Sequence, residues 1–353
     1  MRPTNMVSVC VPAFDRPEMT MQLITSFLKQ SYVAKELVIS DDSPNERISE
    51  LVNGLCEPSI KYFKNPHNLG YSRNLLRSME LAEGDYIILM GDDDAFLTHD
   101  ALARYASVFI DNPKVGYVYS NQVQFSNRVR VQAKFQFFQT DECFSKGEDS
   151  MRNIWLTSVF IPGLAIRNDI SMRDLYPDAD MLFPQVELVG NIINLSESYG
   201  IRECLIAGRA HREQLGFYAI KGERIKGPEK HGTTELFTIF ERLSQQYGFS
   251  FTNEFLVMAL VNRYAIMMFK ERIIIPRSKV HNNYKEFCAM SPEISGSKKL
   301  KLSYWAATVL PSLLINFVRV GGILVVRLLH WREFLIYERE LRESIQVLEG
   351  TKE

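Results

Sequence analysis

Three aspartates stand side by side at the end of an apolar run, in the stretch YIILMGDDDAF from Tyr86 to Phe96. Adjacent negative charges raise one another's pKa, so the group needs a positive partner. Mg²⁺ and Mn²⁺ prefer oxygen ligands and are often held by one or two carboxylates together with substrate phosphates. Asp92, Asp93 and Asp94 therefore predict a site for a divalent cation and a nucleotide. The competing interpretation is a solvated acidic turn in which one aspartate caps the next helix.

Two more acidic positions follow apolar runs in the same way. Asp41 and Asp42 end the run KELVISDD, and Asp15 follows VSVCVPAF. A single carboxylate at such a place is usually a helix cap. Asp15 with Glu18, and Ser43 with Glu46, have the spacing of capping boxes at the starts of two helices.

The elements that position these carboxylates alternate between short apolar runs and amphipathic segments. Apolar runs predict strands, and apolar residues at helical spacing predict helices. Strands are expected at 7–14, 35–42, 59–65, 85–90 and 115–120, and helices at 15–31, 43–55, 70–84 and 98–110. This order predicts a doubly wound α/β fold with a mostly parallel sheet. In such sheets ligands bind at the carboxyl ends of the strands, so the carboxylates should gather at one edge.

Beyond residue 120 the pattern changes. Strands are expected near 128–139 and 201–212, with a helix at 182–200 between them. From about residue 235 the segments are amphipathic helices. We expect one nucleotide-binding domain over 1–215 and a helical C-terminal region over 216–353.

At this point the sequence resembles the inverting glycosyltransferases of family 2, which have the GT-A fold, a Rossmann-like fold that binds nucleotide sugars. The resemblance covers roughly residues 6–120. It is carried by VSVCVPAFDRP, ELVISDDSPN, NPHNLGYSRNLLRSMELAEGDYIILMGDDDAF and HDALARY, which appear in the family's order and spacing.

The resemblance implies roles for particular residues. The loop of Pro12, Ala13, Phe14 and Arg16 would line the sugar-nucleotide site, and Asp41 or Asp42 would hold the base and ribose. Arg73 would approach the nucleotide with Asn74 beside it. Asp92 would contact the ribose. The metal ligands, with Mn²⁺ or Mg²⁺ as cofactor, would be Asp93, Asp94 and His211.

The sequence departs from the family at two places. The usual D-x-D-D begins here with Gly91. The general base of the family often lies in an E-D pair at a helix start, and this chain has no such pair. An inverting transfer needs a base to take the proton of the acceptor hydroxyl. The stretch YPDADMLFPQVELVG offers Asp178, Asp180 and Glu187, of which Glu187 and then Asp180 match best.

The implied partners are a nucleoside-diphosphate sugar, with UDP favoured, and a glycan or polyprenyl-diphosphate acceptor for surface polysaccharide. Thr308 to Trp331 is the most apolar part of the chain, but Arg319, Pro311 and Gly321-Gly322 interrupt it. A membrane span is disfavoured. A buried helix and a helix in the membrane interface remain open, and the basic and aromatic residues over 300–332 would suit the interface.

Composition excludes several other classes. The formal net charge is −1, which gives no sign of nucleic-acid binding. The five cysteines form no C-x-x-C pair, which argues against structural zinc and disulfides and fits a reducing compartment. The N-terminus shows no signal-peptide pattern, so we expect a cytoplasmic protein with peripheral contact at the inner face of the plasma membrane.

Rival functions lack their motifs. The first strand is followed by no glycine-rich loop, which disfavours nucleotidyltransferases and NAD-dependent dehydrogenases. A non-catalytic sugar-nucleotide-binding or scaffold protein of the same fold remains the alternative, because the E-D pair is missing.

Overall fold

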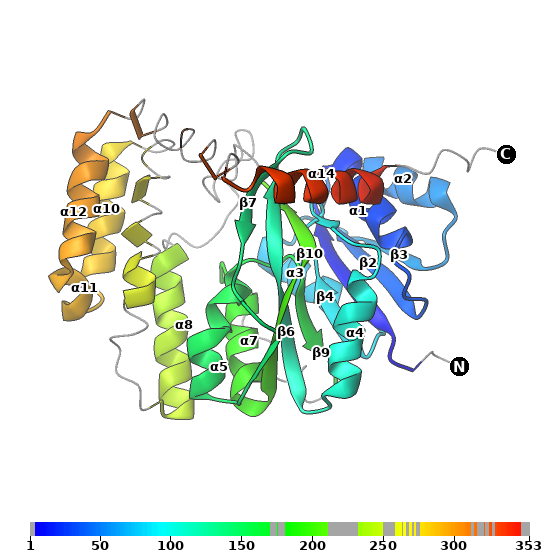
Figure 1. Ribbon diagram of the computed structural model, residues 1–353, viewed down its shortest axis with the longest axis horizontal. Helices are drawn as coiled ribbons and strands as arrows, with labels where there is room; N and C mark the ends of the chain where they lie inside the picture. The colour runs from blue at the N-terminus through cyan, green and yellow to red at the C-terminus, as the bar shows by residue number, and fades with distance from the viewer. Residues whose placement is uncertain are drawn as a thin grey trace. The chain divides into compact units, whose positions relative to one another are not determined.

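The structure is a computed structural model. It describes residues 4–169, 175, 181–210, 232–249, 258–262, 264–265, 268–269, 272, 276–311, 314–315, 321, 325–326 and 329–346. The chain divides into two compact units (Figure 1). Unit 1 comprises Met1–Ala210 with Trp331–Glu353, and unit 2 comprises His211–His330. The expected division at residues 215 and 216 assigned the whole C-terminus to the helical region, and here the structure differs.

Unit 1 is built on a mixed sheet with the order β3-β2-β1-β4-β9-β6-β10-β5, in which β7 also pairs with β6 and β8 with β10. The strands are β1 (Val7–Ala13), β2 (Lys35–Asp41), β3 (Ile60–Lys64), β4 (Tyr86–Leu89), β5 (Ala95–Phe96), β6 (Val115–Phe125), β7 (Val131–Phe135), β8 (Glu142–Phe144), β9 (Leu164–Arg167) and β10 (Glu197–Arg209). The parallel block of β1 to β4 confirms the expected α/β fold.

Helices cover the sheet. They are α1 (Pro17–Leu28), α2 (Arg47–Leu55), α3 (Tyr71–Glu80), α4 (Ala101–Asp111), α5 (Glu148–Asn153), the short 3₁₀ helix η1 (Trp155–Val159) and α7 (Pro184–Leu195). The core holds fully buried aliphatic residues of the central strands, such as Val9 and Ile88, with Phe27 of α1 and Tyr105 of α4. Burial of these side chains fixes which face of each element points inward.

The strand order places a ligand site. The chain passes from β1 to β2 on one side, and β4 joins β1 on the other side. This is a topological switch point, where the loops after two adjacent parallel strands separate and leave room for a ligand. Phe14 follows β1 and Asp92 follows β4, so the sequence motifs lie at this point.

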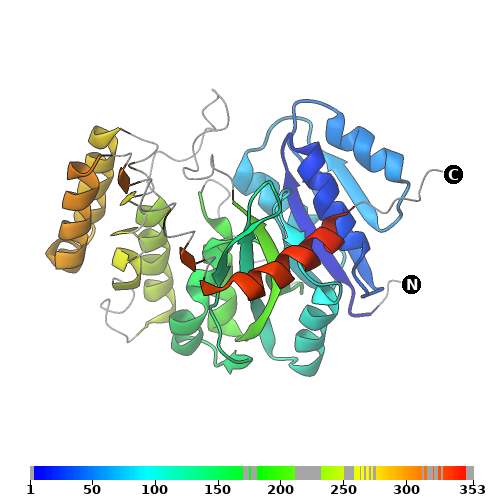
Figure 2. The same ribbon diagram turned by 45° about the horizontal axis from the view of Figure 1, so that its top comes forward.

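Helix α14 (Trp331–Ile345) belongs to unit 1 although unit 2 precedes it in the chain (Figures 1 and 2). Its buried Phe334, Leu341 and Ile345 join Ala95 of β5 and Val131 of β7 in one apolar cluster. The Ser344 hydroxyl donates to the carbonyl of Phe96 at 2.6 Å. Helix α14 therefore covers β5, the strand that directly follows the three aspartates.

Unit 2 is helical in its described parts, which include α8 (Gly232–Tyr247), α10 (Arg277–Cys288), α11 (Pro292–Gly296) and α12 (Lys298–Val309). Tyr284 of α10 stacks on Tyr304 of α12 with ring centroids 3.9 Å apart. Among the described residues, no helix has the length and apolar character needed to cross a bilayer.

Candidate nucleotide and metal site

The turn after β4 carries Asp92, which ties together the ends of β1 and β4. Its Oδ2 accepts from the backbone N–H of Phe14 at 2.9 Å, and its Oδ1 lies 3.1 Å from Nη1 of Arg16. The same Arg16 nitrogen lies 3.0 Å from Oδ2 of Asp93. The loop after β1 thus delivers a backbone donor and a guanidinium to the acidic turn across the switch point.

Asp94 is held from the opposite side by the end of β10. The backbone N–H groups of Arg209 and Gly91 donate to its two carboxylate oxygens at 2.9 and 3.0 Å. The Arg209 guanidinium donates through Nε to the carbonyl of Asp93 at 2.8 Å and lies over the ring of Phe125. Arg209 is only 3% exposed, so it is a buried cation beside a buried acidic turn.

The electrostatics of this turn follow from burial. Burial, partly offset by Arg16, raises the pKa of Asp92 to about 6. Burial and the neighbouring Asp93 charge raise the pKa of Asp94 well above its usual range. Burial disfavours the Arg16 charge, but Asp92 and Asp93 outweigh it and raise the Arg16 pKa. For Arg209 burial prevails and lowers the pKa. Three acids and two arginines leave one excess negative charge when all are ionised.

The carboxylates of Asp93 and Asp94 converge on Gly91. A Cβ at this position would lie 2.5 Å from Oδ2 of Asp94 and 2.9 Å from Oδ1 of Asp93. Only glycine therefore allows the two carboxylates to come together in this turn. Two carboxylates with phosphate and water completing the shell is a common arrangement for Mg²⁺ and Mn²⁺, so these residues fit the implied metal.

The residues that the structure describes supply few metal ligands. Within the described part of the chain, no group of three or more His, Cys, Asp and Glu side chains is arranged to hold a metal ion. The predicted ligand His211 lies outside the described residues, as do Asp178 and Asp180. A cation held by Asp93 and Asp94 would need further ligands from outside the described residues.

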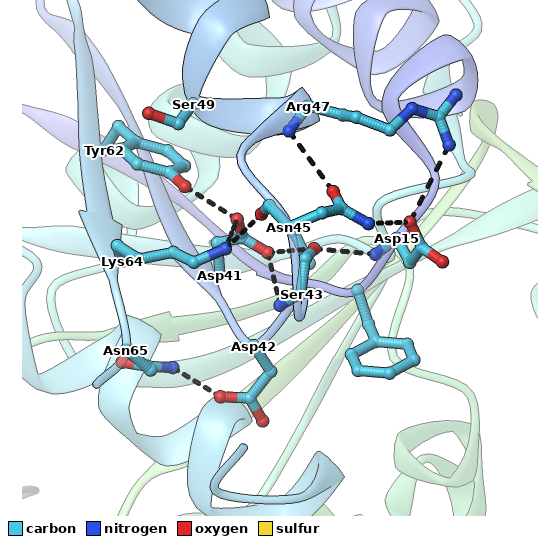
Figure 3. Close-up of polar contacts among 12 residues, drawn as sticks. Asp15, Asp41, Asp42, Ser43, Asn45, Arg47, Ser49, Tyr62, Lys64 and Asn65 are labelled. Atoms are coloured by element: carbon cyan, nitrogen blue, oxygen red, sulfur yellow. Dashed lines mark hydrogen bonds and ion pairs between the residues drawn. The ribbon is translucent and has the colours of Figure 1, made fainter. Parts of the chain in front are cut away.

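Asp41 and Asp42 have different surroundings, which Figure 3 shows. Asp41 is completely buried and accepts from both the N–H and the hydroxyl of Ser43, from the Tyr62 hydroxyl at 2.6 Å and from Nζ of Lys64 at 3.2 Å. A carboxylate has about four acceptor sites, so those of Asp41 are filled by the protein. Its role in the structure is to fix the end of β2.

Asp42 faces the start of α3. Its Oδ1 accepts from Nδ2 of Asn65 at 2.7 Å, and its Oδ2 accepts from the N–H of Leu69 at 3.1 Å. Burial raises its pKa, and these hydrogen bonds only partly oppose the rise. Asn65 also donates to Asn74, which donates to the carbonyl of Ala13. The predicted residues Ala13, Asp42 and Asn74 therefore belong to one hydrogen-bonded network.

The first turn of α3 carries Tyr71, Ser72 and Arg73. Tyr71 is 37% exposed, and desolvation of its hydroxyl together with the negative charge of Asp94 raises the pKa of the phenol. Arg73 is exposed in the same turn. The Ser72 hydroxyl donates to the carbonyl of Met181, which joins α3 to the segment leading into α7.

The candidate base Glu187 is half-buried in the first turn of α7. The bond between Ser72 and Met181 holds the segment that precedes α7 against α3. Within α7, the carbonyl of Val186 accepts from the Trp155 indole at 3.0 Å. These contacts fix the start of α7.

Sequence reasoning missed two members of the site, Arg209 and Tyr71. Arg209 stands two residues before the predicted ligand His211, and its proximity to Asp94 depends on the pairing of β10 with β6 and β5. Tyr71 adjoins the recognised S-R-N motif. Asp15 and Ser43 were expected to cap helices, but α1 has Arg16 and α2 has Glu46 at the N-cap, neither with a side-chain capping bond. Ser43 instead accepts from the N–H of Asp15 at 2.8 Å.

Comparison with known proteins bears on the family and the fold. Residues 8–171 match the model of the glycosyl transferase family 2. Abequosyltransferase RfbV of Salmonella typhimurium is 36% identical over 104 residues, which are 28% of this chain and 31% of that protein. A Campylobacter jejuni enzyme, GalNAc(5)-diNAcBac-PP-undecaprenol beta-1,3-glucosyltransferase, is 30% identical over 95 residues, which are 26% of this chain and 31% of that protein. The chain thus matches about a third of the length of these relatives.

A solved structure extends the likeness of the fold. The crystal structure of S. aureus TarS 1–349 in complex with UDP-GlcNAc superimposes with a TM-score of 0.54 at 12% identity, covering 86% of this chain and 90% of TarS 1–349. Such low identity shows a common fold only. Together with the family match over β1 to β9, it means that this chain carries a glycosyl transferase family 2 domain with the GT-A fold.

Proposed function

We propose that the protein transfers a sugar from a nucleoside-diphosphate sugar to a hydroxyl group of a glycan or lipid-linked acceptor, with inversion at the anomeric carbon. The observation that carries this proposal is the acidic turn at the switch point, where the carboxylates of Asp93 and Asp94 come together beside Arg16. The relatives described above are named as an abequosyltransferase and a glucosyltransferase, which supports the same class of reaction.

The donor nucleoside would occupy the loop of Pro12, Ala13 and Phe14. Since the protein fills the acceptor sites of Asp41, we assign contact with the base and ribose to Asp42 rather than to Asp41. Asn74 supports the loop through the carbonyl of Ala13 at 3.3 Å. UDP is the favoured nucleotide, because the similar TarS structure holds UDP-GlcNAc.

The diphosphate would lie between the acidic turn and the first turn of α3. Asp93 and Asp94 would hold Mn²⁺ or Mg²⁺, with His211 as a further ligand and Asp92 toward the ribose. When bound, such a cation stabilises the negative charge that develops on a departing phosphate oxygen. Arg73 and the Tyr71 phenol would donate hydrogen bonds to the diphosphate.

Glu187 is the proposed general base, with Asp180 as the other candidate. The carboxylate takes the proton of the acceptor hydroxyl while the oxygen attacks the anomeric carbon. The bond from that carbon to the diphosphate breaks on the opposite face, and its electron pair leaves with the nucleoside diphosphate. The start of α7 is suited to this task because its contacts with η1 and α3 fix its position.

The acceptor would be presented at the cytoplasmic face of the membrane. The Campylobacter relative is named for an undecaprenol-diphosphate acceptor, which supports a lipid-linked substrate here. A cytoplasmic enzyme that works on such a lipid must reach the bilayer surface, so peripheral attachment is part of the proposal.

A thermal-shift screen of nucleoside diphosphates and sugar nucleotides, with and without Mn²⁺, tests the donor site. A ligand of the folded state raises the melting temperature by mass action. We expect one sugar nucleotide to stabilise the protein in a Mn²⁺-dependent manner, and Asp93→Asn to remove that dependence. If no member of the panel stabilises the wild-type protein, the proposed function is wrong.

The alternative, a sugar-nucleotide-binding protein without catalysis, makes a different prediction. It would give the same thermal shift, but no nucleoside diphosphate would be released when acceptor lipid is added. Release that depends on Glu187 or Asp180 separates the two.

A further inference from the structure

We propose that α12 (Lys298–Val309) is a docking helix that seats the protein on an anionic lipid bilayer. This inference names the surface for the membrane attachment in the proposed function and rests on that function only for its biological purpose. It is based on three observations: an exposed apolar stripe, a separate buried face on the same helix, and side-chain charges on that helix that are all positive.

The apolar stripe consists of Leu302, Trp305 and Val309. These side chains are 65%, 58% and 52% exposed, far more than apolar residues of a packed helix. Their spacing of three and four residues puts them on one face of the helix. A group of large exposed apolar side chains on one helix face is a common mark of an interaction surface.

This stripe is not the face that packs within unit 2. Leu300 and Ala307 are completely buried and lie on the opposite side of the helix. Tyr304, near that side, stacks on Tyr284 and bonds His281 of α10. The inner face of α12 therefore provides the packing that holds the helix in unit 2. Among the described residues, the outer apolar face takes no part in that packing and is available for another contact.

The positive charge around the stripe indicates that its partner is anionic. Lys298, Lys299 and Lys301 are exposed, and α12 contains no acidic residue. Pro276–Pro311 contains six lysine and arginine residues against two glutamates. Since Lys298 lies on the stripe's own face and Lys299 and Lys301 flank it, an anionic surface would meet apolar and cationic groups together.

A bilayer fits this arrangement better than a protein groove does. Trp is favoured at the membrane interface, where its ring lies among the headgroups, and lysines extend their ammonium groups to the lipid phosphates. An interfacial helix lies in the plane of the membrane with its apolar face inserted. α12 has only 12 residues, which suits lying on a membrane and is too short for crossing it.

Co-sedimentation of the full chain with lipid vesicles tests the proposal. Two kinds of vesicle are compared, one of phosphatidylcholine alone and one that also contains phosphatidylglycerol. We expect binding to the anionic vesicles that weakens as salt is added. Leu302→Ala with Trp305→Ala should weaken binding by about tenfold or more, because the two largest side chains that insert into the bilayer are lost. Lys298→Glu with Lys301→Glu should remove the preference for anionic lipid.

Two matched controls locate the effect. Trp331→Ala removes a Trp of similar exposure, 53%, from α14 in unit 1. Lys146→Glu reverses an exposed lysine in unit 1. Both should bind vesicles as the wild type does. Equal loss in Trp331→Ala, equal binding to neutral and anionic vesicles, or unchanged binding by the α12 variants would each overturn the assignment. So would a wild-type dimer that the α12 variant converts to monomer, because a second copy would then cover the stripe.

The failure of this inference can be told from failure of the proposed function. Nucleotide binding is read by the thermal shift with Mn²⁺ and sugar nucleotide, and the α12 variants should keep it in full. Loss of vesicle binding with the thermal shift retained supports the docking role. A wild-type chain that binds vesicles but no sugar nucleotide would contradict the transferase and leave the docking helix standing.

Discussion

At the scale of single residues, the acidic turn is balanced from within the protein. Arg16 contacts Asp92 and Asp93, and the buried Arg209 holds the carbonyl of Asp93. Crowding of three carboxylates therefore has two internal cations to offset it. We therefore expect the turn to fold without a metal ion, and any bound metal to serve the substrate's diphosphate.

Asp93→Asn tests this division. We expect the ligand-free variant to melt within a few degrees of the ligand-free wild type. In the variant, Arg16 still pairs with Asp92 and Arg209 still bonds the backbone of the turn. Turnover should fall by about 10²-fold or more, because charge stabilisation in the transition state is lost. Circular dichroism melting and nucleoside diphosphate release measure the two effects. A large loss of apo stability with turnover retained would contradict the assignment.

Substitutions of Asp41 and Asp42 should likewise have different effects, the first on stability and the second on ligand binding. Asp41→Asn leaves Lys64 without its carboxylate and breaks a fully buried network, so we expect a loss of about 2–4 kcal/mol in the free energy of unfolding. Asp42→Asn should cost less stability and abolish the thermal shift given by the sugar nucleotide. Urea unfolding and the ligand screen, run on both variants, show whether the two roles are reversed.

The position of this site could be predicted from the sequence, but the separate roles of its residues could not. Asp41 and Asp42 are neighbours of the same type, and only the placement of Tyr62 and Lys64 on β3 shows that the first is filled by the protein. Ser43 has the signature of a helix cap, yet its hydroxyl bonds Asp41 and the loop after β1. Arg209 reaches the turn through a strand more than a hundred residues away, which no local pattern encodes.

At the scale of elements, α14 acts as a cover for β5 and β7. Its buried Glu338 accepts from the N–H of Val131 at 2.9 Å, and Glu333 pairs with Lys134. Deletion of residues 300–353 would thus remove part of the core of unit 1 together with α12. Point substitutions on α12 are the sharper test of membrane docking.

Two leucines of α14 give a matched pair. Leu341 is fully buried and Leu335 is 52% exposed. Leu341→Ala should cost about 2–5 kcal/mol, the usual loss for a buried leucine. Leu335→Ala should stay within about 0.5 kcal/mol of the wild type. Equal effects in chemical unfolding would show that α14 does not pack on the sheet in solution.

Glu36 joins three strands and gives a prediction about pH. From β2 it accepts from Ser8 of β1 at 2.5 Å and pairs with Lys61 of β3 at 2.8 Å. Burial alone would raise its pKa, but Lys61, Ser8 and the N–H of Glu83 outweigh burial and lower the pKa below its ordinary 4.5. Its stabilisation is therefore complete above that ordinary value and is lost as pH falls through the lower folded pKa.

Glu36→Gln should accordingly destabilise the protein by about 1–3 kcal/mol at pH 7. The difference from the wild type should shrink below about pH 4.5, where the wild-type carboxylate also becomes protonated. Unfolding curves at several pH values measure it. A difference that stays constant down to pH 3 would mean that the ion pair contributes nothing.

Among the elements, those with local signals were predictable. The strands β1 to β4 are short apolar runs, and the helices between them show apolar residues at helical spacing, so sequence and structure agree there. β5 has only two residues and exists because β10 pairs with it. The antiparallel insertion of β9 between β4 and β6 likewise depends on contacts distant in the chain.

At the scale of the whole molecule, unit 2 is an insertion between β10 and α14 of unit 1. The nucleotide-site residues that the structure describes all belong to unit 1, and α12 belongs to unit 2. Each unit has its own buried apolar residues. The proposed donor site and the proposed docking helix thus belong to different compact units.

Calorimetry of the full chain tests this independence. We expect two unfolding transitions, since compact units with separate cores need not unfold together. Sugar nucleotide with Mn²⁺ should raise the temperature of one transition, that of unit 1, and leave the other unchanged. A single transition that shifts as a whole would show that the units unfold as one.

The position of α14 after the inserted unit also bears on biosynthesis. A polypeptide emerging from the ribosome exposes β5 and the apolar side of β7 throughout translation of unit 2, because α14 is synthesised after that unit. Uncovered apolar surface and strand edges favour aggregation. Nascent chains that stall or terminate within the insertion should therefore become clients of chaperones and proteases, although the whole nucleotide motif has already been synthesised.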